Sequence, residues 1–332
     1  MRTPLLAPLF VPLLAVCASA QVRPYRVVDL GPVPGGSPLA GVTCAAISDD
    51  GEVIGGTSVW DPYVWRSGAG MLALQVPAGF LNGTVHDVDV FGQAVGTVGL
   101  PTVSYPTTAA RWSATGAVQV LGTLGGLFSS ATATNNLGVV VGTSQLPGSS
   151  VSHAFEWTAA GGMVDLTPGL AGSSSVVDIN DAGQMCMVIG SAPYRFTPGV
   201  GLEPLGNVQG LRINRFGQMA GKDFVNGTAG RYTDGVGWEM FAAGSPVQLR
   251  EIGGIDGFGH VVGTQWVLQN PSPPSYQKTA YLYSSALGFR RLADWIDAPQ
   301  PVFVTGVSGI ADDGRIAAYG ALGPNNRAFL LE

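Results

Sequence analysis

The sequence predicts an all-β fold, a seven-bladed β-propeller built from four-stranded antiparallel blades. Three observations lead to this prediction: the composition, an internal repeat, and an unmatched strand near the start of the chain that supplies the strand missing from the last repeat. The 332 residues include 49 glycines and 23 prolines, and only 11% of them are charged. Such a composition is typical of a chain rich in turns and strands. The high hydrophobic content argues against disorder.

A five-residue motif recurs seven times. Each copy has an apolar or small residue, a short polar residue, two variable residues and a glycine. Asn or Asp near Gly tolerates the positive φ of a tight turn, so each copy predicts a hairpin between two short strands. The copies lie at residues 47–51, 88–92, 134–138, 179–183, 213–217, 255–259 and 310–314.

A second glycine follows the motif four residues later in five copies, at Gly55, Gly96, Gly142, Gly221 and Gly263. In the fourth and seventh copies the corresponding stretches, residues 184–190 and 315–320, are longer. An extra residue in one strand of a pair is the mark of a β-bulge. We therefore predict bulges in these two stretches.

A second predicted hairpin follows each motif, so that a full repeat contains four strands. The motif glycines are spaced by about 44 residues on average, near the period of a propeller blade. The repeats run over about residues 25–70, 71–117, 118–162, 163–201, 202–237, 238–288 and 289–332.

The two ends of the chain complete one blade. The seventh repeat stops without a fourth strand, and an unmatched strand lies at residues 27–30. An open stack of blades would leave exposed strand edges at both ends. We therefore predict that residues 27–30 pair with residues 328–331 and close the ring.

The first 20 residues have the features of a secretory signal. Arg2 precedes an apolar stretch, and small residues end at Ala20. We expect cleavage after Ala20, with residues 21–332 exported as a single propeller domain, secreted or periplasmic. Cys17 raises the alternative of lipoprotein processing, which the bulky Val16 disfavours. No later apolar segment reaches the ~20 residues of a membrane span.

The charge of the chain limits the classes of partner that it can bind. The formal net charge is −6 and the chain has no basic stripe, which argues against nucleic acid and anionic membrane surfaces. We expect a monomer that binds an extracellular glycan or protein.

Residues able to perform chemistry are scattered. His86, His153 and His260 fall at three different strand positions, so we expect structural histidines and predict no metal, cofactor or catalytic residue. Cys44 and Cys186 belong to the first and fourth repeats, which predicts buried free thiols. Four acid pairs recur at the hairpin register, where Asp stabilises turns. They are Asp49 with Asp50, Asp87 with Asp89, Asp178 with Asp181, and Asp312 with Asp313.

Variable loops give the candidate binding site. The loops between second and third strands, and those between blades, differ in length, and the longest covers residues 264–277. Variable loops on a rigid scaffold are where binding usually resides. Trp60, Trp266, Tyr276 and Trp295 lie on this face in blades six, seven and one, where they could stack on sugars or anchor a protein. The alternative is that each aromatic ring packs against its own loop.

The third repeat resembles the HAF repeat family of bacterial extracellular proteins. The resemblance rests on "LGTLGG", "NNLGVVVG", "HAFEW" and "GGMVDL", all between residues 121 and 166. The other repeats keep the glycines and aromatic positions. The resemblance implies an exported repeat protein and supplies no catalytic residues.

We therefore expect a secreted, non-enzymatic binding or structural module. The alternative is a propeller enzyme, a hydrolase or lyase acting on extracellular polysaccharide through acids such as Asp61, Asp294 or Asp297.

Overall fold

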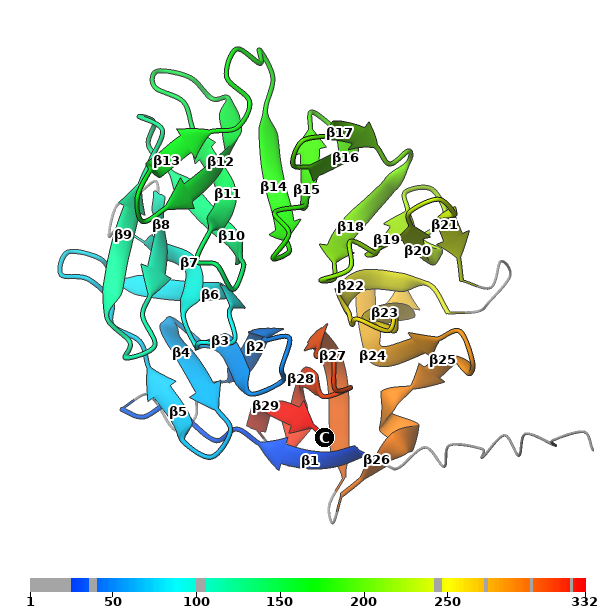
Figure 1. The fold of residues 1–332 in the computed structure, drawn as a ribbon. Coiled ribbons are helices and arrows are strands. Elements are labelled where there is room, and N and C mark those ends of the chain that lie inside the picture. Colours follow the sequence, from blue (N-terminus) through cyan, green and yellow to red (C-terminus); the bar gives the residue numbers. More distant parts are fainter. Residues whose placement is uncertain are drawn as a thin grey trace, which may run out of the picture.

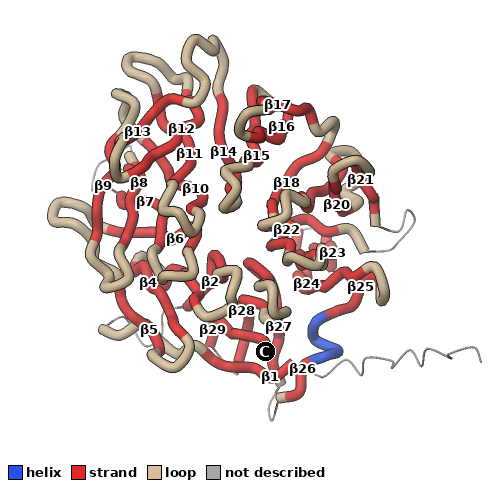
Figure 2. Tube along the Cα trace, viewed as in Figure 1, coloured by secondary structure: helices blue, strands red, loops and turns tan. Residues whose placement is uncertain are grey.

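Seven antiparallel sheets surround a central axis in the computed structural model (Figure 1). The structure describes residues 25–35, 41–99, 106–241, 247–271, 274–298, 301–322 and 325–332. In these residues the secondary structure is almost entirely β (Figure 2), with the short 3-10 helix η1 (Leu292–Trp295) as the exception. The predicted seven-bladed propeller is confirmed.

Each of the first six blades contains four consecutive strands, with the innermost strand first. Blade 1 consists of β2 (Val42–Ile47), β3 (Val53–Ser58), β4 (Asp61–Arg66) and β5 (Gly70–Ala73). Blade 2 consists of β6 (Asn82–Val88), β7 (Ala94–Gly99), β8 (Thr107–Trp112) and β9 (Val118–Gly122). Blade 3 consists of β10 (Ser129–Thr134), β11 (Val140–Gln145), β12 (Ser152–Thr158) and β13 (Gly162–Asp165).

The next three blades have the same order of strands. Blade 4 consists of β14 (Ser174–Ile179), β15 (Met185–Ile189), β16 (Ala192–Thr197) and β17 (Gly201–Pro204). Blade 5 consists of β18 (Val208–Ile213), β19 (Met219–Asp223), β20 (Ala229–Thr233) and β21 (Gly237–Met240). Blade 6 consists of β22 (Leu249–Ile255), β23 (Val261–Pro271), β24 (Pro274–Ser284) and β25 (Gly288–Arg291).

Blade 7 joins the two ends of the described chain. It consists of β27 (Val302–Ile310), β28 (Ile316–Leu322), β29 (Asn325–Leu331) and β1 (Tyr25–Asp29), with the short β26 (Ile296–Asp297) beside β1. In Figure 1 the blue strand β1 lies against the red strand β29. Val27 pairs with Leu331 and Val28 with Leu330, which confirms the predicted closure. Each predicted repeat therefore joins the outermost strand of one blade to the first three strands of the next.

Hydrophobic clusters fill the interfaces between blades. One cluster contains Val95 and Ala109 of blade 2 with Ala131 and Phe155 of blade 3. Six further clusters join the other neighbouring blades, including blades 7 and 1. Because both faces of every blade are apolar, each blade depends on the neighbours on its two sides.

Turn geometry confirms the predicted first hairpin of each blade. The motif glycine has a positive φ in all seven copies, as predicted from the tight turn. These glycines are Gly51, Gly92, Gly138, Gly183, Gly217, Gly259 and Gly314, with φ between 72° and 88°.

The β-bulges lie elsewhere than predicted. The strand pairing is regular between β15 and β16 and between β28 and β29, so the bulges expected at residues 184–190 and 315–320 are wrong. Instead the innermost strand of every blade carries a bulge. The second glycine of the repeat faces this bulge. A Cβ at Gly96 would lie 1.9 Å from the Thr84 carbonyl oxygen, and one at Gly142 would lie 2.0 Å from that of Ser130.

Replacing Val28 by proline should weaken the ring closure. Proline removes the N–H group that the strand pairing with Leu330 requires. We expect the free energy of unfolding, measured by urea denaturation, to fall by about 2 kcal/mol or more. Val28→Ala measures how much of this loss comes from the side chain, which packs against the cluster between blades 7 and 1.

Val164→Pro is the matched control. Val164 lies in the outermost strand β13 of blade 3, opposite Glu156. There the chain continues into neighbouring strands on both sides, so a weakened pairing does not free a terminus. We expect a smaller loss of stability. Equal losses for the two proline variants would contradict a special role for the closure.

Candidate functional site

The predicted long loop at residues 264–277 is instead part of a β-hairpin. Strands β23 and β24 each contain 11 residues, so they extend well beyond the rest of blade 6. Their pairing continues with Trp266 opposite Lys278 and Leu268 opposite Tyr276. Trp, Val, Leu and Tyr favour strands. This preference outweighed Pro271 and Pro274, which pair with each other at the far end of the hairpin.

One face of the hairpin, called here the hairpin face, carries Trp266, Leu268, Tyr276 and Lys278. Residues directly opposite each other in an antiparallel pair project from the same side. The ring centroids of Trp266 and Tyr276 are 6.0 Å apart, and Lys278 Nζ lies 4.2 Å from the Trp266 ring. Leu268 and Tyr276 are 49% and 53% exposed.

The other two predicted aromatic residues lie apart from the hairpin face. Trp60 is exposed in the turn between β3 and β4 of blade 1, next to Val59, whose φ is 53°. Blade 7 separates this turn from blade 6. Trp295 is partly buried against the cluster between blades 6 and 7. The structure therefore brings together Trp266 and Tyr276 of the four residues predicted to bind a ligand.

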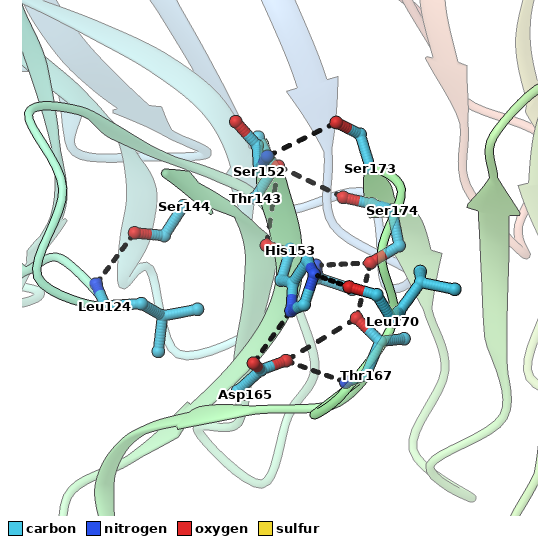
Figure 3. Close-up of polar contacts among 11 residues, drawn as sticks. Leu124, Thr143, Ser144, Ser152, His153, Asp165, Thr167, Leu170, Ser173 and Ser174 are labelled. Atoms are coloured by element: carbon cyan, nitrogen blue, oxygen red, sulfur yellow. Dashed lines mark hydrogen bonds and ion pairs between the residues drawn. The ribbon is translucent and has the colours of Figure 1, made fainter. Parts of the chain in front are cut away.

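The histidine of the HAF triplet connects parts of the scaffold (Figure 3). His153 Nδ1 lies 2.8 Å from Asp165 Oδ2, and its Nε2 lies 3.0 Å from the Leu170 carbonyl oxygen. The side chain is buried. His153 thus joins β12 to the outermost strand of blade 3 and to the connection that enters blade 4.

Serine side chains connect neighbouring blades. Ser174 Oγ, at the start of β14, accepts a hydrogen bond of 2.9 Å from the Ala154 N–H in blade 3 (Figure 3). Ser129 Oγ, at the start of β10, accepts one of 2.8 Å from the Ala109 N–H in blade 2. A serine at the start of the innermost strand therefore stabilises the contact with the preceding blade at two places in the ring.

The remaining candidates for chemistry are also engaged in the fold. His260 Nδ1 lies 2.8 Å from Asp256 Oδ2, and His86 Nδ1 lies 2.7 Å from the Ala131 carbonyl oxygen. Burial lowers the pKa of His86. Cys44 and Cys186 are free and buried, as predicted. Among the described residues, no group of three or more His, Cys, Asp or Glu side chains is placed to hold a metal ion.

A central channel runs between the innermost strands, and residues from all seven blades line it. Its cavity measures about 140 Å³. Several lining residues lie in or directly after the bulges, including Ala45, His86, Thr132, Val177 and Ser308.

Two aspartates in the channel connect neighbouring blades. Asp87 Oδ2 accepts a hydrogen bond of 2.8 Å from the Thr134 N–H, and Asp178 Oδ2 accepts one of 3.0 Å from the Ile213 N–H. The turn role predicted for these two residues is wrong, because each follows a bulge that directs its side chain to the next blade. Asp89 does stabilise its turn, since its Oδ1 accepts the Phe91 N–H.

Burial raises the pKa values of the channel carboxyls. The pKa of Asp87 rises from 3.8 to about 8, first through desolvation and then through the charge of Asp178. Desolvation also raises the pKa of Asp178. The pKa of Asp49, at the end of the channel, rises to about 6 through desolvation and the charge of Asp312.

The two ends of the channel carry opposite charges. At the end formed by the first hairpin turns, called here the acidic mouth, five aspartates surround one arginine. They are Asp49, Asp50, Asp181, Asp312 and Asp313, with Arg215. At the opposite end, called here the basic mouth, the charged lining residues are Arg212, Lys222, Arg250 and Glu251.

The acids considered for a polysaccharide enzyme do not form a shared site. Asp61 starts β4 in blade 1, Asp294 forms an ion pair with Arg291, and Asp297 lies in the short strand β26 beside β1. These three aspartates are not among the described residues that line the channel or its two mouths.

Fold and channel define the class of protein, a seven-bladed β-propeller with a charged axial channel. Neither a protein-family model nor a curated protein sequence matches the chain. The described residues contain no helix with the length and hydropathy of a membrane span.

Solved structures share the fold. A catalytically inactive virginiamycin B lyase from Staphylococcus aureus with quinupristin has a TM-score of 0.56 at 11% identity, covering 93% of this chain and 99% of the lyase. YCF48 bound to D1 peptide has a TM-score of 0.54 at 11% identity, covering 94% of this chain and 97% of YCF48. Puromycin hydrolase has a TM-score of 0.53 at 13% identity, covering 84% of this chain and 50% of the hydrolase. These similarities establish the fold alone.

The channel carboxyls should make the protein less stable as the pH rises. Because the pKa of Asp87 is raised to about 8 in the folded state, the folded protein holds a proton that the unfolded chain has already released above about pH 4. We expect the free energy of unfolding to fall between about pH 4 and 8 and Asp87→Asn to reduce this fall. Urea denaturation at a series of pH values measures it.

Asp61→Asn is the control, because it removes the same charge from an exposed position. It should leave the pH dependence unchanged. If Asp87→Asn and the wild-type protein lose stability in parallel, the assignment of the effect to the channel is wrong.

Proposed function

We propose that this protein is an exported, non-enzymatic binding module of the HAF repeat type, and that its hairpin face binds an extracellular protein partner. The observation that carries the proposal is the extension of β23 and β24 beyond the other strands of blade 6. The projecting parts of these strands, with Leu268 and Tyr276, are not among the described residues of the clusters between blades.

The exposed side chains of the hairpin support this function. Leu268 and Tyr276, which both lie on the hairpin face, are 49% and 53% exposed. A group of exposed apolar side chains is costly in water and often marks a surface that another molecule covers. Trp266, Tyr276 and Lys278 add aromatic rings and a cation, and aromatic side chains are enriched where proteins bind each other.

The chemistry of this surface favours a protein over a glycan. Sugar binding requires open aromatic faces with hydrogen-bonding groups around them. Here Lys278 lies over the Trp266 ring, and Trp266 Nε1 is buried without a hydrogen-bond partner among the residues that the structure describes. Leu268 is aliphatic and offers no hydrogen bond to a sugar hydroxyl. An apolar side chain of a protein partner suits such a surface better.

The geometry of the channel supports a non-enzymatic role. Asp87 and Asp178 each accept backbone N–H groups from the next blade, so their carboxyls already contribute to the fold. A polysaccharide hydrolase or lyase is the alternative function, and it would need a pair of acids on either side of its substrate. Asp61, Asp294 and Asp297 lie on three separate elements.

A photo-crosslinking amino acid at position 276 tests the proposal. We expect it to crosslink the full mature chain to one extracellular protein in a saturable manner, identified by mass spectrometry. Leu268→Ser with Tyr276→Ser should weaken binding of that protein by about tenfold or more, as loss of central contacts does in other interfaces.

The controls use matched exposed residues on outer strands. Leu202 and Val164 are 48% and 53% exposed, close to the values for Leu268 and Tyr276. A crosslinker at position 202 should capture nothing, and Leu202→Ser with Val164→Ser should bind as the wild type does. Saturable binding to a glycan array that depends on Tyr276 would instead favour a glycan ligand. Absence of both activities would contradict the proposed function.

A further inference from the structure

The basic mouth gathers three cations around one opening. Arg212 and Lys222 come from blade 5 and Arg250 from blade 6, and Glu251 is the carboxylate among the lining residues. The opening has a volume of about 590 Å³. It lies at the start of the innermost strands, on the same side as the extended hairpin of blade 6.

We propose that the basic mouth is a binding site for an oxyanion, a carboxylate, sulfate or phosphate group carried by a small ligand or an acidic sugar. The proposal concerns a site separate from the hairpin face and does not depend on it.

Within the described residues the three cations form no direct ion pair, although Glu251 lies near Lys222 and Asp178 lies near Arg212. Arg195, Arg231 and other arginines do form ion pairs. Lys222 Nζ donates to the Arg250 carbonyl oxygen, and an Arg212 guanidinium N–H donates to the Leu211 carbonyl oxygen at 2.8 Å. Backbone oxygens satisfy donors but do not neutralise charge.

The three cations around this one opening repel one another, which is unfavourable. Burial and the nearby Arg250 lower the pKa of Lys222. Both effects oppose the charged form of the lysine, and a bound anion would relieve both. The arrangement therefore fits a site that is completed by a negatively charged group.

Bulges place these cations at the opening. In β18 the pairing shifts between Gln209 and Arg212, and Gly210 has a φ of 68°. In β22 one bulge between Leu249 and Glu251 leaves Arg250 without a partner in the ladder. Blade 6 has this bulge in addition to the one that all blades share. Bulges redirect side chains and occur next to functional sites.

The Tyr319 hydroxyl adds a hydrogen-bond donor beside the cations. Thr43 and Ser308 also line the opening, but their hydroxyls already donate to the carbonyl oxygens of Thr57 and Cys44. The Tyr319 ring lies across Gly306, where a Cβ would be 2.3 Å from the tyrosine hydroxyl. Only glycine leaves room for the ring there. The planar guanidinium groups of two arginines are suited to the paired oxygens of carboxylate, sulfate and phosphate.

Calorimetric titration of the mature chain tests the proposal. The probes are sodium phosphate, sodium sulfate and a galacturonate trimer, titrated at constant ionic strength. We expect saturable binding of at least one probe, with Arg250→Gln weakening it about tenfold or more. Binding of the trimer alone indicates an acidic sugar, and binding of the inorganic ions indicates a free anion site.

Arg290→Gln is the matched control. Arg290 is also an exposed arginine of blade 6 without an ion pair among the described residues, but it lies on the outermost strand β25. The Arg290→Gln variant should bind the probe as the wild-type protein does. Circular dichroism verifies folding, and Lys222→Gln provides a second variant if Arg250→Gln does not fold.

Two results would overturn the proposal: no saturable binding of any probe by the wild-type protein, or equal weakening by Arg250→Gln and Arg290→Gln. The double substitution of Leu268 and Tyr276 by serine should leave anion binding unchanged, so the two proposals succeed or fail separately.

Discussion

The pairing of β1 with β29 is the interaction on which the rest of the molecule depends. Every blade presents apolar residues on both faces, and only a closed ring covers all of them. Val27 and Val28 provide the contact that joins the two ends of the described chain, facing Leu331 and Leu330. Val28 packs against the cluster between blades 7 and 1, and Leu30 directly after β1 belongs to it, so the closing segment also contributes to the core. One short strand thus completes both a sheet and an interface.

The bulges of the innermost strands connect the scaffold to its chemistry. In blades 2 and 4 the bulge turns one residue, His86 or Val177, toward the channel and lets the next residue, an aspartate, reach the neighbouring blade. Asp87 and Asp178 use this geometry to accept N–H groups from blades 3 and 5. Their raised pKa values follow from burial in the channel. The hydrogen bonds from the next blade lower these pKa values, so burial is the cause of the upward shift.

Sequence reasoning reached the fold because its signals are local and repeated. The turn at Gly92 and the strand from Val118 could be predicted from a few neighbouring residues. The bulges could not, because the glycine that marks one, such as Gly96, lies on the opposite strand. The two mouths were also missed. Asp49 and Asp312 meet only when the ring closes, and no local pattern indicates this. Trp60 and Trp266 were predicted to lie on one face. The pattern of residues does not show that blade 7 keeps the two side chains apart.

The opposite charges of the two mouths give the disc an electric dipole along its axis. Near a negatively charged cell wall or matrix, the end with Arg250 is attracted and the end with Asp49 is repelled. The disc would then settle with one flat side down, and this side carries Tyr276. At physiological salt such orientation acts only within about 8 Å. The field would therefore select the approach angle in the last step before contact, independently of how tightly any partner is held.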